Sequence, residues 1–473
     1  MKYTSTRGGV TGLDFEAVLF SGFAADGGLF MPEEIPTLDV GTIQEWSSYS
    51  YKELVKEICS LFIPVDSIPR KDLNALIDRA MIRFRHQDIV PLRRLESGLN
   101  VLEMWHGATH AFKDLAMSCV GQFLDYFLQK RMKHVNIVVG TSGDTGSSSI
   151  ESVRGIKNID IIVLLPHGRC TKIQELQMTT VLDNNVHVFS VEGTSDELDV
   201  PIKNLFADTE FVKKHNLMST NSVNWARVLV QIAHFFYAYF RSAQTTQSGS
   251  TPSVEIVVPS GGAGNITAGC IAQKMGLPIS LVAAVNKNDI IHRIVQNGDF
   301  SLGDTESSLA SAMDIQEPYN MERIFWLLAE SKRKNVKQIM EEYLTKKQFK
   351  LPEELHRKIA GAMKSCSVND DHILATIRRC WDENKYLLCP HSAVAAFYHY
   401  QQHDRDQTSV RCCLGPASAA KFPEVTVRAG LTPDVPQEIQ ALMEMETRST
   451  LLRKGEDWEK ILREKINAID EQN

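Results

Sequence analysis

The chain has 473 residues, of which 43% are hydrophobic and 23% are charged, a composition typical of folded globular proteins. Its formal net charge is −7, and no run of Lys and Arg is long enough to follow a polyanion, which makes nucleic acid a poor candidate partner. The longest apolar stretches are much shorter than the roughly 20 residues that cross a bilayer, so we expect no membrane-spanning segment.

The amino terminus and the cysteines indicate a cytoplasmic protein. The first residues contain no apolar core of the secretory kind and too few arginines for a transit peptide. The nine cysteines are an odd number and include no C-x-x-C pair, which argues against a disulfide framework and against a structural zinc site. We therefore expect reduced thiols and no bound metal.

The first 90 residues are predicted to form a small N-terminal domain with helices. Leu54, Ile58 and Leu61 share one helical face, and a second periodic stretch runs from Leu73 to Phe84. From about residue 98, short apolar runs alternate with amphipathic stretches, and this pattern predicts an α/β fold with parallel sheets covered by helices. The predicted strands are residues 135–140, 159–166, 186–192, 254–259 and 281–286.

Three further segments complete the predicted organisation. The polar residues 242–253 are expected to separate two α/β lobes. Residues 330–385 are rich in Lys and Glu with helical spacing and no strand runs, so they are predicted to be a mostly helical insertion. Near the end, Trp458, Ile461, Leu462, Ile466 and Ile469 form the apolar face of a helix that we expect to dock on the core. The predicted domains are residues 1–90, a core of 91–425 and a helical tail of 426–473.

Two predicted strands end in glycine-rich turns that open helices, at residues 141–146 and 260–265. Glycines let the backbone approach a ligand, and the first N–H groups of a helix attract negative charge. Neither turn matches G-x-x-x-x-G-K-S/T or a complete dinucleotide fingerprint, which disfavours ATP and NAD. The turns either only connect strand to helix or, as a pair, bind two separate anions such as a cofactor phosphate and a substrate carboxylate.

A lysine segment, residues 106–114, precedes a long helical pattern. Lys113 follows Phe112, and His106, His110 and Asp114 are close in sequence. A lone lysine is usually a solvated surface charge, whereas one removed from water has a lowered pKa and can act as an imine-forming amine. The two histidines are expected to pack or to form hydrogen bonds around the lysine turn.

These motifs, taken together, resemble those of threonine synthase, and more closely those of the threonine synthase-like phospho-lyases of vertebrates. Such proteins are pyridoxal-phosphate enzymes of fold type II, so the resemblance implies two doubly wound open-sheet lobes of the tryptophan-synthase-β type. The resemblance extends over nearly the whole chain. Its segments are the Lys113 segment and residues 3–8, 26–32, 141–146, 168–174, 221–227, 261–265, 313–315, 320–323, 390–394 and 420–423.

The resemblance implies roles for individual residues. Lys113 would bind pyridoxal 5'-phosphate through an imine, be displaced by the substrate amine and then carry protons. The cofactor phosphate would be held by the loop Gly261, Gly262, Ala263, Gly264 and Asn265. The substrate carboxylate would be held by Thr141, Ser142 and Thr145, with Asp144 near the phenolic oxygen of the cofactor. The phosphate of a phosphorylated amino acid would be held by Arg169, Thr171 and Gln174, with Asn224 and Arg227 as further candidates.

The chain departs from the synthase pattern at two positions. Synthases commonly have Gly-Asn-Phe-Gly-Asn where this chain has Gly-Gly-Ala-Gly-Asn at residues 261–265. Pro416 stands where the family usually offers a threonine hydroxyl to the pyridine nitrogen, and a proline side chain cannot donate a hydrogen bond. Ser418 is the nearest hydroxyl in the sequence and is therefore the candidate replacement.

The resemblance implies two possible reactions, which share their first steps. A lyase eliminates phosphate from O-phosphothreonine or O-phosphohomoserine and yields 2-oxobutanoate and ammonia, whereas a synthase delivers water to the β-carbon and yields threonine. The changes at Ala263 and Pro416 favour the lyase. The alternatives are a true threonine synthase acting on O-phosphohomoserine and a non-catalytic binding protein with the same fold. The expected partner is a small phosphorylated amino acid, and the resemblance also allows a homodimer.

Overall fold

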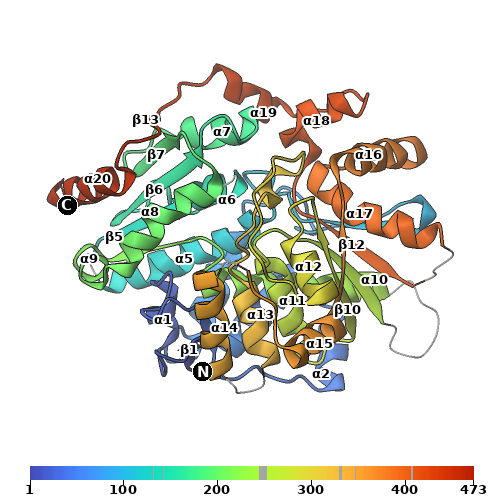
Figure 1. The fold of residues 1–473 in the computed structure, drawn as a ribbon, viewed down its shortest axis with the longest axis horizontal. Helices are drawn as coiled ribbons and strands as arrows, with labels where there is room; N and C mark the ends of the chain where they lie inside the picture. Colours follow the sequence, from blue (N-terminus) through green and yellow to red (C-terminus); the bar gives the residue numbers. More distant parts are fainter. Residues whose placement is uncertain are drawn as a thin grey trace.

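A computed structural model of the chain describes residues 1–131, 133–141, 143–243, 253–329, 333–346, 348–405 and 409–472. Two open sheets with helices on their faces form the core, and a smaller N-terminal unit packs beside them (Figure 1). Most of the polar segment 242–253, which the sequence predicts to separate the lobes, lies outside the described residues.

The first sheet has five parallel strands in the order β13-β7-β6-β5-β8. Its three central strands are buried hydrophobic runs, as expected for a sheet covered on both faces, and the sequence prediction for them is confirmed. The strands are β5 (Val135–Gly140), β6 (Ile159–Pro166), β7 (Val186–Val191), β8 (Leu217–Met218) and β13 (Thr450–Leu452). The helices of this lobe are α6 (Asp144–Val153), α7 (Lys172–Thr179), α8 (Ser195–Ala207) and α9 (Thr209–His215).

The second sheet has six strands in the order β11-β10-β9-β12-β4-β3, and only the β3–β4 pair is antiparallel. Strand β12 comes from late in the chain yet lies between β4 and β9, so the residues that follow β12 emerge at the centre of the sheet edge. The strands are β3 (Leu92–Arg94), β4 (Asn100–Glu103), β9 (Val254–Pro259), β10 (Ile279–Val285), β11 (Met363–Ser367) and β12 (Arg411–Gly415). Helix α11 (Gly264–Lys274) follows β9 directly.

Helix α10 (Trp225–Ala243) joins the N-terminal unit to the core. It is buried on nearly every side, because α3 (Tyr51–Phe62), α5 (Lys113–Arg131) and α11 all pack against it. Tyr3 and Tyr51 of the N-terminal unit are fully buried in the same hydrophobic cluster as Trp225. The unit consists of β1 (Tyr3–Ser5), β2 (Phe30–Pro32), α1 (Phe15–Leu19), α2 (Val40–Trp46), α3 (Tyr51–Phe62) and α4 (Arg70–Met81).

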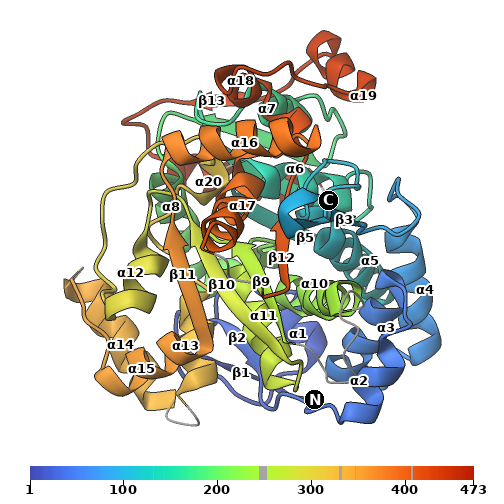
Figure 2. The same cartoon turned by 90° about the vertical axis from the view of Figure 1, so that its right-hand side faces the viewer.

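The predicted insertion at residues 330–385 is mostly helical, but the expectation that it lacks a strand is wrong. Strand β11 pairs in parallel with β10 and forms the edge of the six-stranded sheet (Figure 2). Its sequence, Met-Lys-Ser-Cys-Ser, contains no apolar run, and only Met363 of this edge strand is fully buried. The helices of this segment are α14 (Arg333–Lys346), α15 (Glu353–Ala362) and α16 (Asp370–Asn384). Helices α12 (Ile290–Asn297) and α13 (Met321–Leu328) precede the segment, and α17 (Pro390–His403) follows it.

The C-terminal segment is docked on the first lobe rather than free. Helix α20 (Trp458–Gln472) buries Leu462, Ile466 and Ile469 against α8 and α9, which confirms the predicted docking (Figure 1). The tail that the sequence predicts to be helical also contains a strand, β13, which pairs with β7 and extends the sheet. Two of the three residues of β13 are exposed, so the strand has little of the hydrophobic pattern that would reveal it. The short helices α18 (Pro423–Arg428) and α19 (Gln437–Gln440) precede β13.

Candidate active site

A cleft lies where the carboxyl ends of strands from both sheets meet, which is the usual position of ligand sites in open α/β folds. Its walls come from the start of α5, the turn between β5 and α6, helix α10, the turn between β9 and α11, and the segment after β12. The side chains that carry chemistry are Lys113, Asp144, Thr145, Ser222, Arg227, Gln231, Ser260, Asn265 and His391. Chain segments distant in sequence therefore converge on one site.

Lys113 is the first residue of α5 and lines this cleft. The segment before it pairs with the segment after β12, since the Phe112 N–H donates to Pro416 O at 2.7 Å and Ala111 forms a bridge with Ala417. Burial lowers the pKa of Lys113 to about 8, an effect that Asp144 opposes and that Arg227 and Lys421 reinforce. A substantial fraction of this amine is therefore neutral near physiological pH and able to attack a carbonyl carbon.

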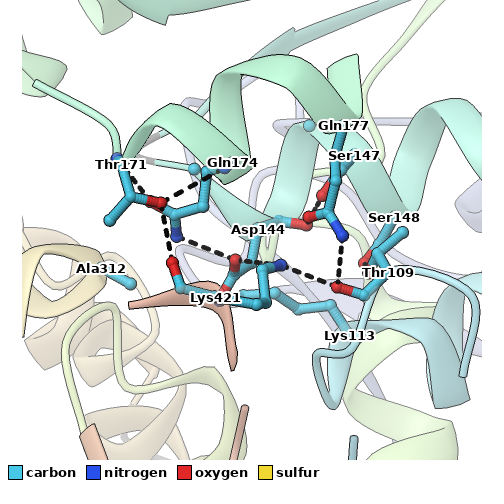
Figure 3. Close-up of polar contacts among 12 residues, drawn as sticks. Thr109, Lys113, Asp144, Ser147, Ser148, Thr171, Gln174, Gln177, Ala312 and Lys421 are labelled. Carbon is cyan, nitrogen blue, oxygen red and sulfur yellow. Dashed lines mark hydrogen bonds and ion pairs between the residues drawn. The ribbon is translucent and has the colours of Figure 1, made fainter. Parts of the chain in front are cut away.

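Asp144 lies between two lysines at the first turn of α6 (Figure 3). Its Oδ1 is 2.6 Å from Lys421 Nζ and accepts a hydrogen bond from Gln174 Nε2 at 2.9 Å, while its Oδ2 is 3.8 Å from Lys113 Nζ. Burial alone would raise the pKa of this carboxyl group, but Lys421, Lys113 and Gln174 together lower it below its ordinary value. Asp144 is thus a carboxylate at neutral pH.

Lys421 is a site residue to which the sequence analysis assigns no role. It is fully buried at the end of the short helix η3 (Ala419–Lys421), and its Nζ also donates to Thr109 O at 2.8 Å (Figure 3). Lysine is almost never fully buried unless it is paired, because removing an ammonium group from water is costly. The signal in the sequence is the position of this lysine between small and aromatic residues, Ala-Ala-Lys-Phe.

The turn between β9 and α11 presents an open helix amino terminus to the cleft. Ala263 is its N-cap, with a left-handed φ of 61° and no side-chain cap hydrogen bond, and Gly264 begins the helix. A Cβ on Gly261 would lie 2.9 Å from Met313 Cα, so the backbone passes too close to its neighbour for a side chain. Asn320 holds the loop by donating from Nδ2 to Gly262 O at 3.0 Å. The first N–H groups of α11 have no partner within the helix and can bind an anion.

Four buried polar atoms of the cleft-lining residues have no partner among the residues that the structure describes: Arg227 Nε, Gln231 Oε1, Asn265 Oδ1 and His391 Nδ1. Burial lowers the pKa of His391 to about 4, so its ring is neutral. His391 Nε2 accepts from the Ala312 N–H at 3.1 Å, and the proton of the neutral ring therefore resides on Nδ1. Burial also lowers the pKa of Arg227, to about 10, which still leaves its guanidinium charged. The unsatisfied donors of Arg227 and His391 fit an anionic ligand.

Several residues predicted to bind the substrate phosphate lie elsewhere. Arg169 is exposed and does not line the cleft. Thr171 caps α7 and donates to Lys421 O at 3.0 Å, and Gln174 binds Asp144. Asn224 donates to the main-chain oxygens of Leu19, Ser21 and Ser219. Of this set, only Arg227 lines the cleft in the described residues, because the hydrogen-bonding groups of the other four are directed to the fold itself or to solvent.

The remaining predicted residues divide in the same way. Thr145 lines the cleft, but Thr141 Oγ1 accepts from the N–H groups of Gly143 and Gly146 and faces an adjoining pocket. Ser142 lies outside the described residues. Ser418 Oγ accepts from the Ala420 N–H and is absent from the described lining, whereas Pro416 is part of it. Among the described residues, the predicted replacement hydroxyl is therefore not in the cleft, and its role as a cofactor contact has no support in this geometry.

Comparison with known proteins identifies the family. The chain matches three family models: "Threonine synthase N terminus" over residues 2–81, "Pyridoxal-phosphate dependent enzyme" over 85–410, and "Threonine synthase, C-terminal" over 392–463. It is 72% identical to the Xenopus laevis protein "Threonine synthase-like 2", over 100% of this chain and 99% of that protein. The human "Threonine synthase-like 2" is 63% identical over 100% of this chain and 98% of its own length.

The chain belongs to the threonine synthase family. Solved structures agree with this membership. The yeast threonine synthase has a TM-score of 0.89 and 34% identity, and a pyridoxal-phosphate-bound threonine synthase from Brucella melitensis has a TM-score of 0.90 and 33% identity; each match covers 99% of both chains. The chain is thus a member of a family of pyridoxal-phosphate-dependent enzymes, and its cofactor is pyridoxal 5'-phosphate.

The cleft fits this cofactor on its own chemistry. It contains a partly neutral amine at Lys113, which suits an aldehyde, and an open helix terminus at Gly264, which suits a phosphate. In the described part of the chain no group of His, Cys, Asp and Glu side chains is arranged to hold a metal ion, and no helix is both long and apolar enough to cross a bilayer.

Proposed function

We propose that this member of the threonine synthase family is a phospho-lyase. It would eliminate phosphate from O-phosphothreonine, and from O-phosphohomoserine, to give 2-oxobutanoate, ammonia and phosphate. The observation that carries this proposal is that both departures from the synthase pattern, Ala263 and Pro416, line the same cleft as Lys113. Differences at the site itself can change the outcome of a reaction that the fold otherwise shares.

In this proposal each end of the cleft holds one anion. The N–H groups at the start of α11 hold the cofactor phosphate, and Arg227 with the Nδ1–H of His391 holds the phosphate of the substrate. When bound, the cofactor withdraws electrons from the substrate and makes the α-proton removable. Lys113, whose amine faces the cleft, accepts that proton and returns it later.

Asp144 and Lys421 act together in the same proposal. Asp144 carries negative charge beside Lys113, and the buried ammonium of Lys421 balances that charge. Once Lys113 has accepted the proton, two charged lysines lie around one carboxylate, and this part of the cleft has a net positive charge. Such a field favours substrate oxygens that carry negative charge and a departing phosphate.

The lyase outcome follows from what the cleft lacks at two positions. A synthase must keep its substrate in place through removal of a second proton and addition of water to the β-carbon. At residue 263 a methyl group stands where synthases commonly have an aromatic ring, and at residue 416 a proline stands where they have a hydroxyl donor. With fewer contacts to restrain the bound intermediate, early release and hydrolysis to the 2-oxo acid are favoured over hydration.

The product profile of the purified holoenzyme tests this proposal. With either phosphorylated amino acid, 2-oxobutanoate and phosphate should form in equal amounts, as measured by lactate dehydrogenase coupling and phosphate release. Threonine as the main product from O-phosphohomoserine would instead establish the synthase alternative. A yellow protein without turnover of either substrate would support the non-catalytic alternative.

A cytoplasmic location is part of the same proposal. All nine cysteines are free thiols in the structure, and most of them are buried. Unpaired thiols are typical of proteins that fold in a reducing compartment. Imaging of the tagged full-length protein against compartment markers tests this part independently of the reaction.

A further inference from the structure

A second cavity, of about 290 Å³, lies away from the Lys113 cleft, and none of the residues that the structure describes lines both. It is enclosed by three parts of the chain: residues 7–29 of the N-terminal unit, helix α8, and the segments that contain α13 and α14. We call it the α8–α14 cavity. Its volume is near the lower end of the range for small-molecule sites, which are usually apolar clefts between structural units.

Five aromatic residues contribute to the walls of the α8–α14 cavity. The ring of Tyr343 stacks on Phe300 with centroids 4.0 Å apart and planes 8° apart, and Phe23 packs edge-on against Tyr319 at 5.7 Å. Phe206 completes the aromatic part of the lining. Such walls favour a flat apolar ligand, because aromatic rings bury large areas and pair well with one another.

One polar atom in this lining is unsatisfied. The hydroxyl of Tyr343 is buried and has no hydrogen-bond partner among the described residues, although only 6% of the residue is exposed. Burial, with Glu317 and Asp196 nearby, raises the pKa of Tyr343, so the hydroxyl remains protonated and can donate or accept. A buried polar group without a partner destabilises the protein, and a ligand atom that hydrogen-bonds to it would remove that cost.

The charged groups of this cavity are already paired. Lys203 Nζ lies 2.5 Å from Glu317 Oε2, and Arg7 forms two 3.0 Å contacts with the carboxylate of Glu322. The formal charges of these four lining residues therefore cancel. A charged ligand would enter without a counter-charge, so the lining selects a neutral molecule.

The cavity is also connected to the active site. Glu317 and Tyr319 line a smaller pocket as well, and the lining of that pocket also includes Thr145 and Gly262 of the Lys113 cleft. Tyr319 donates to Asp199 at 2.7 Å, and the next residue, Asn320, donates to the main-chain oxygen of Gly262. One short segment therefore contacts both the α8–α14 cavity and the loop at the start of α11.

We infer that the α8–α14 cavity binds a small neutral aromatic molecule that hydrogen-bonds to Tyr343, and that its occupancy alters the active site through residues 317–320. The site is separate from the one that holds the cofactor and requires no particular reaction outcome. Occupancy fixes Tyr319, and hence the hydrogen-bonded contacts that position Gly262.

The test uses the holoenzyme and three probes of similar shape: benzamide, benzoate and benzylamine. Binding is measured by saturation-transfer NMR and titration calorimetry. We expect saturable binding of benzamide and at least tenfold weaker binding of the two charged probes. Benzamide should also shift the visible absorbance or fluorescence of the bound cofactor, a readout that does not depend on turnover.

Three variants locate the binding. Tyr343→Phe should weaken benzamide binding about three- to tenfold without lowering the melting temperature, because the hydroxyl has no partner to lose. Leu344→Trp, at an exposed position on the rim, should abolish binding, whereas Leu451→Trp on β13 should not. Any one of three results would overturn the assignment. Benzamide could bind both Tyr343→Phe and Leu344→Trp with unchanged affinity, a charged probe could bind more tightly than benzamide, or benzamide could fail to bind. Binding that leaves the cofactor spectrum unchanged would overturn the link to the active site.

Discussion

The two glycine-rich turns look alike in sequence, but the structure gives them opposite electrostatic characters. At the β9–α11 turn no side chain caps the helix, and its first N–H groups face the cleft. At the β5–α6 turn Thr141 Oγ1 accepts from Gly143 and Gly146, and the helix begins with its own carboxylate, Asp144. One turn is therefore open to an anion from outside, while the other supplies an anion to Lys113. A strand–glycine–helix pattern predicts a helix terminus but not what occupies it.

Removal of the Lys113 amine should have the largest effect, and the affected quantity is turnover. Lys113→Ala should lower turnover by at least about a thousandfold, because both attachment of the cofactor and proton transfer depend on this side chain. The absorbance of the imine should disappear as well, while the circular dichroism spectrum remains that of the wild type. Turnover within tenfold of wild type would remove Lys113 from its proposed role.

Neutralising the internal anion of the β5–α6 turn should destabilise the fold. Asp144→Asn leaves the buried ammonium of Lys421 without its counter-charge, and the free energy of unfolding should fall by about 3–5 kcal/mol in denaturant titrations. The double variant Asp144→Asn/Lys421→Met should recover most of this loss. Because the pKa of Asp144 is lowered in the folded state, its stabilisation is complete above the ordinary carboxyl pKa of about 4 and declines as pH falls below that value. The difference in the free energy of unfolding between wild type and Asp144→Asn should therefore become smaller at acid pH.

Adding a carboxylate to the β9–α11 turn should give it an internal negative charge, as at the β5–α6 turn. A Cβ at Gly262 has room, with its nearest neighbour, Ser222 Oγ, at 3.7 Å, so Gly262→Asp places a negative charge at the proposed phosphate site without a backbone clash. We expect roughly a hundredfold weaker cofactor affinity, about 3 kcal/mol of repulsion, measured by titrating the apoenzyme. Gly262→Asn is the matched control, since it has nearly the same shape without the charge. Equal affinities of the two variants would contradict a phosphate site at this turn.

The smallest effect concerns the protonation of Lys113. The neutral amine reacts with an aldehyde, and its fraction rises with pH through the pKa of about 8, so the rate of cofactor attachment should increase roughly fivefold from pH 7 to pH 8. Stopped-flow absorbance of apoenzyme mixed with pyridoxal 5'-phosphate measures this rate. Because Asp144 raises the pKa of Lys113, the midpoint should move to lower pH in Asp144→Asn. A midpoint near the ordinary lysine value of about 10.4 would show that burial does not act as described.

Residues with a local signal could be predicted, whereas residues whose role depends on long-range contacts could not. Lys113 follows an aromatic residue in a recognisable motif, and the central strands of both sheets are apolar runs. Arg169 and Asn224 have suitable chemistry for an anion site, yet one is exposed and the other binds three main-chain oxygens of its surroundings. His391 offers a buried donor to the cleft only because α17 brings it opposite Ala312.

The α/β class, the two helix termini after glycine-rich turns and the candidate amine can all be predicted from the amino-acid sequence, because each depends on neighbours within about ten residues. Three features require the folded chain: Lys421 balances Asp144, β11 and β13 complete the sheets, and Thr141 closes its own turn. Burial explains the difference. A buried charge or hydroxyl must find a partner wherever the fold brings one within reach, and Lys421 lies 277 positions further along the chain than Asp144.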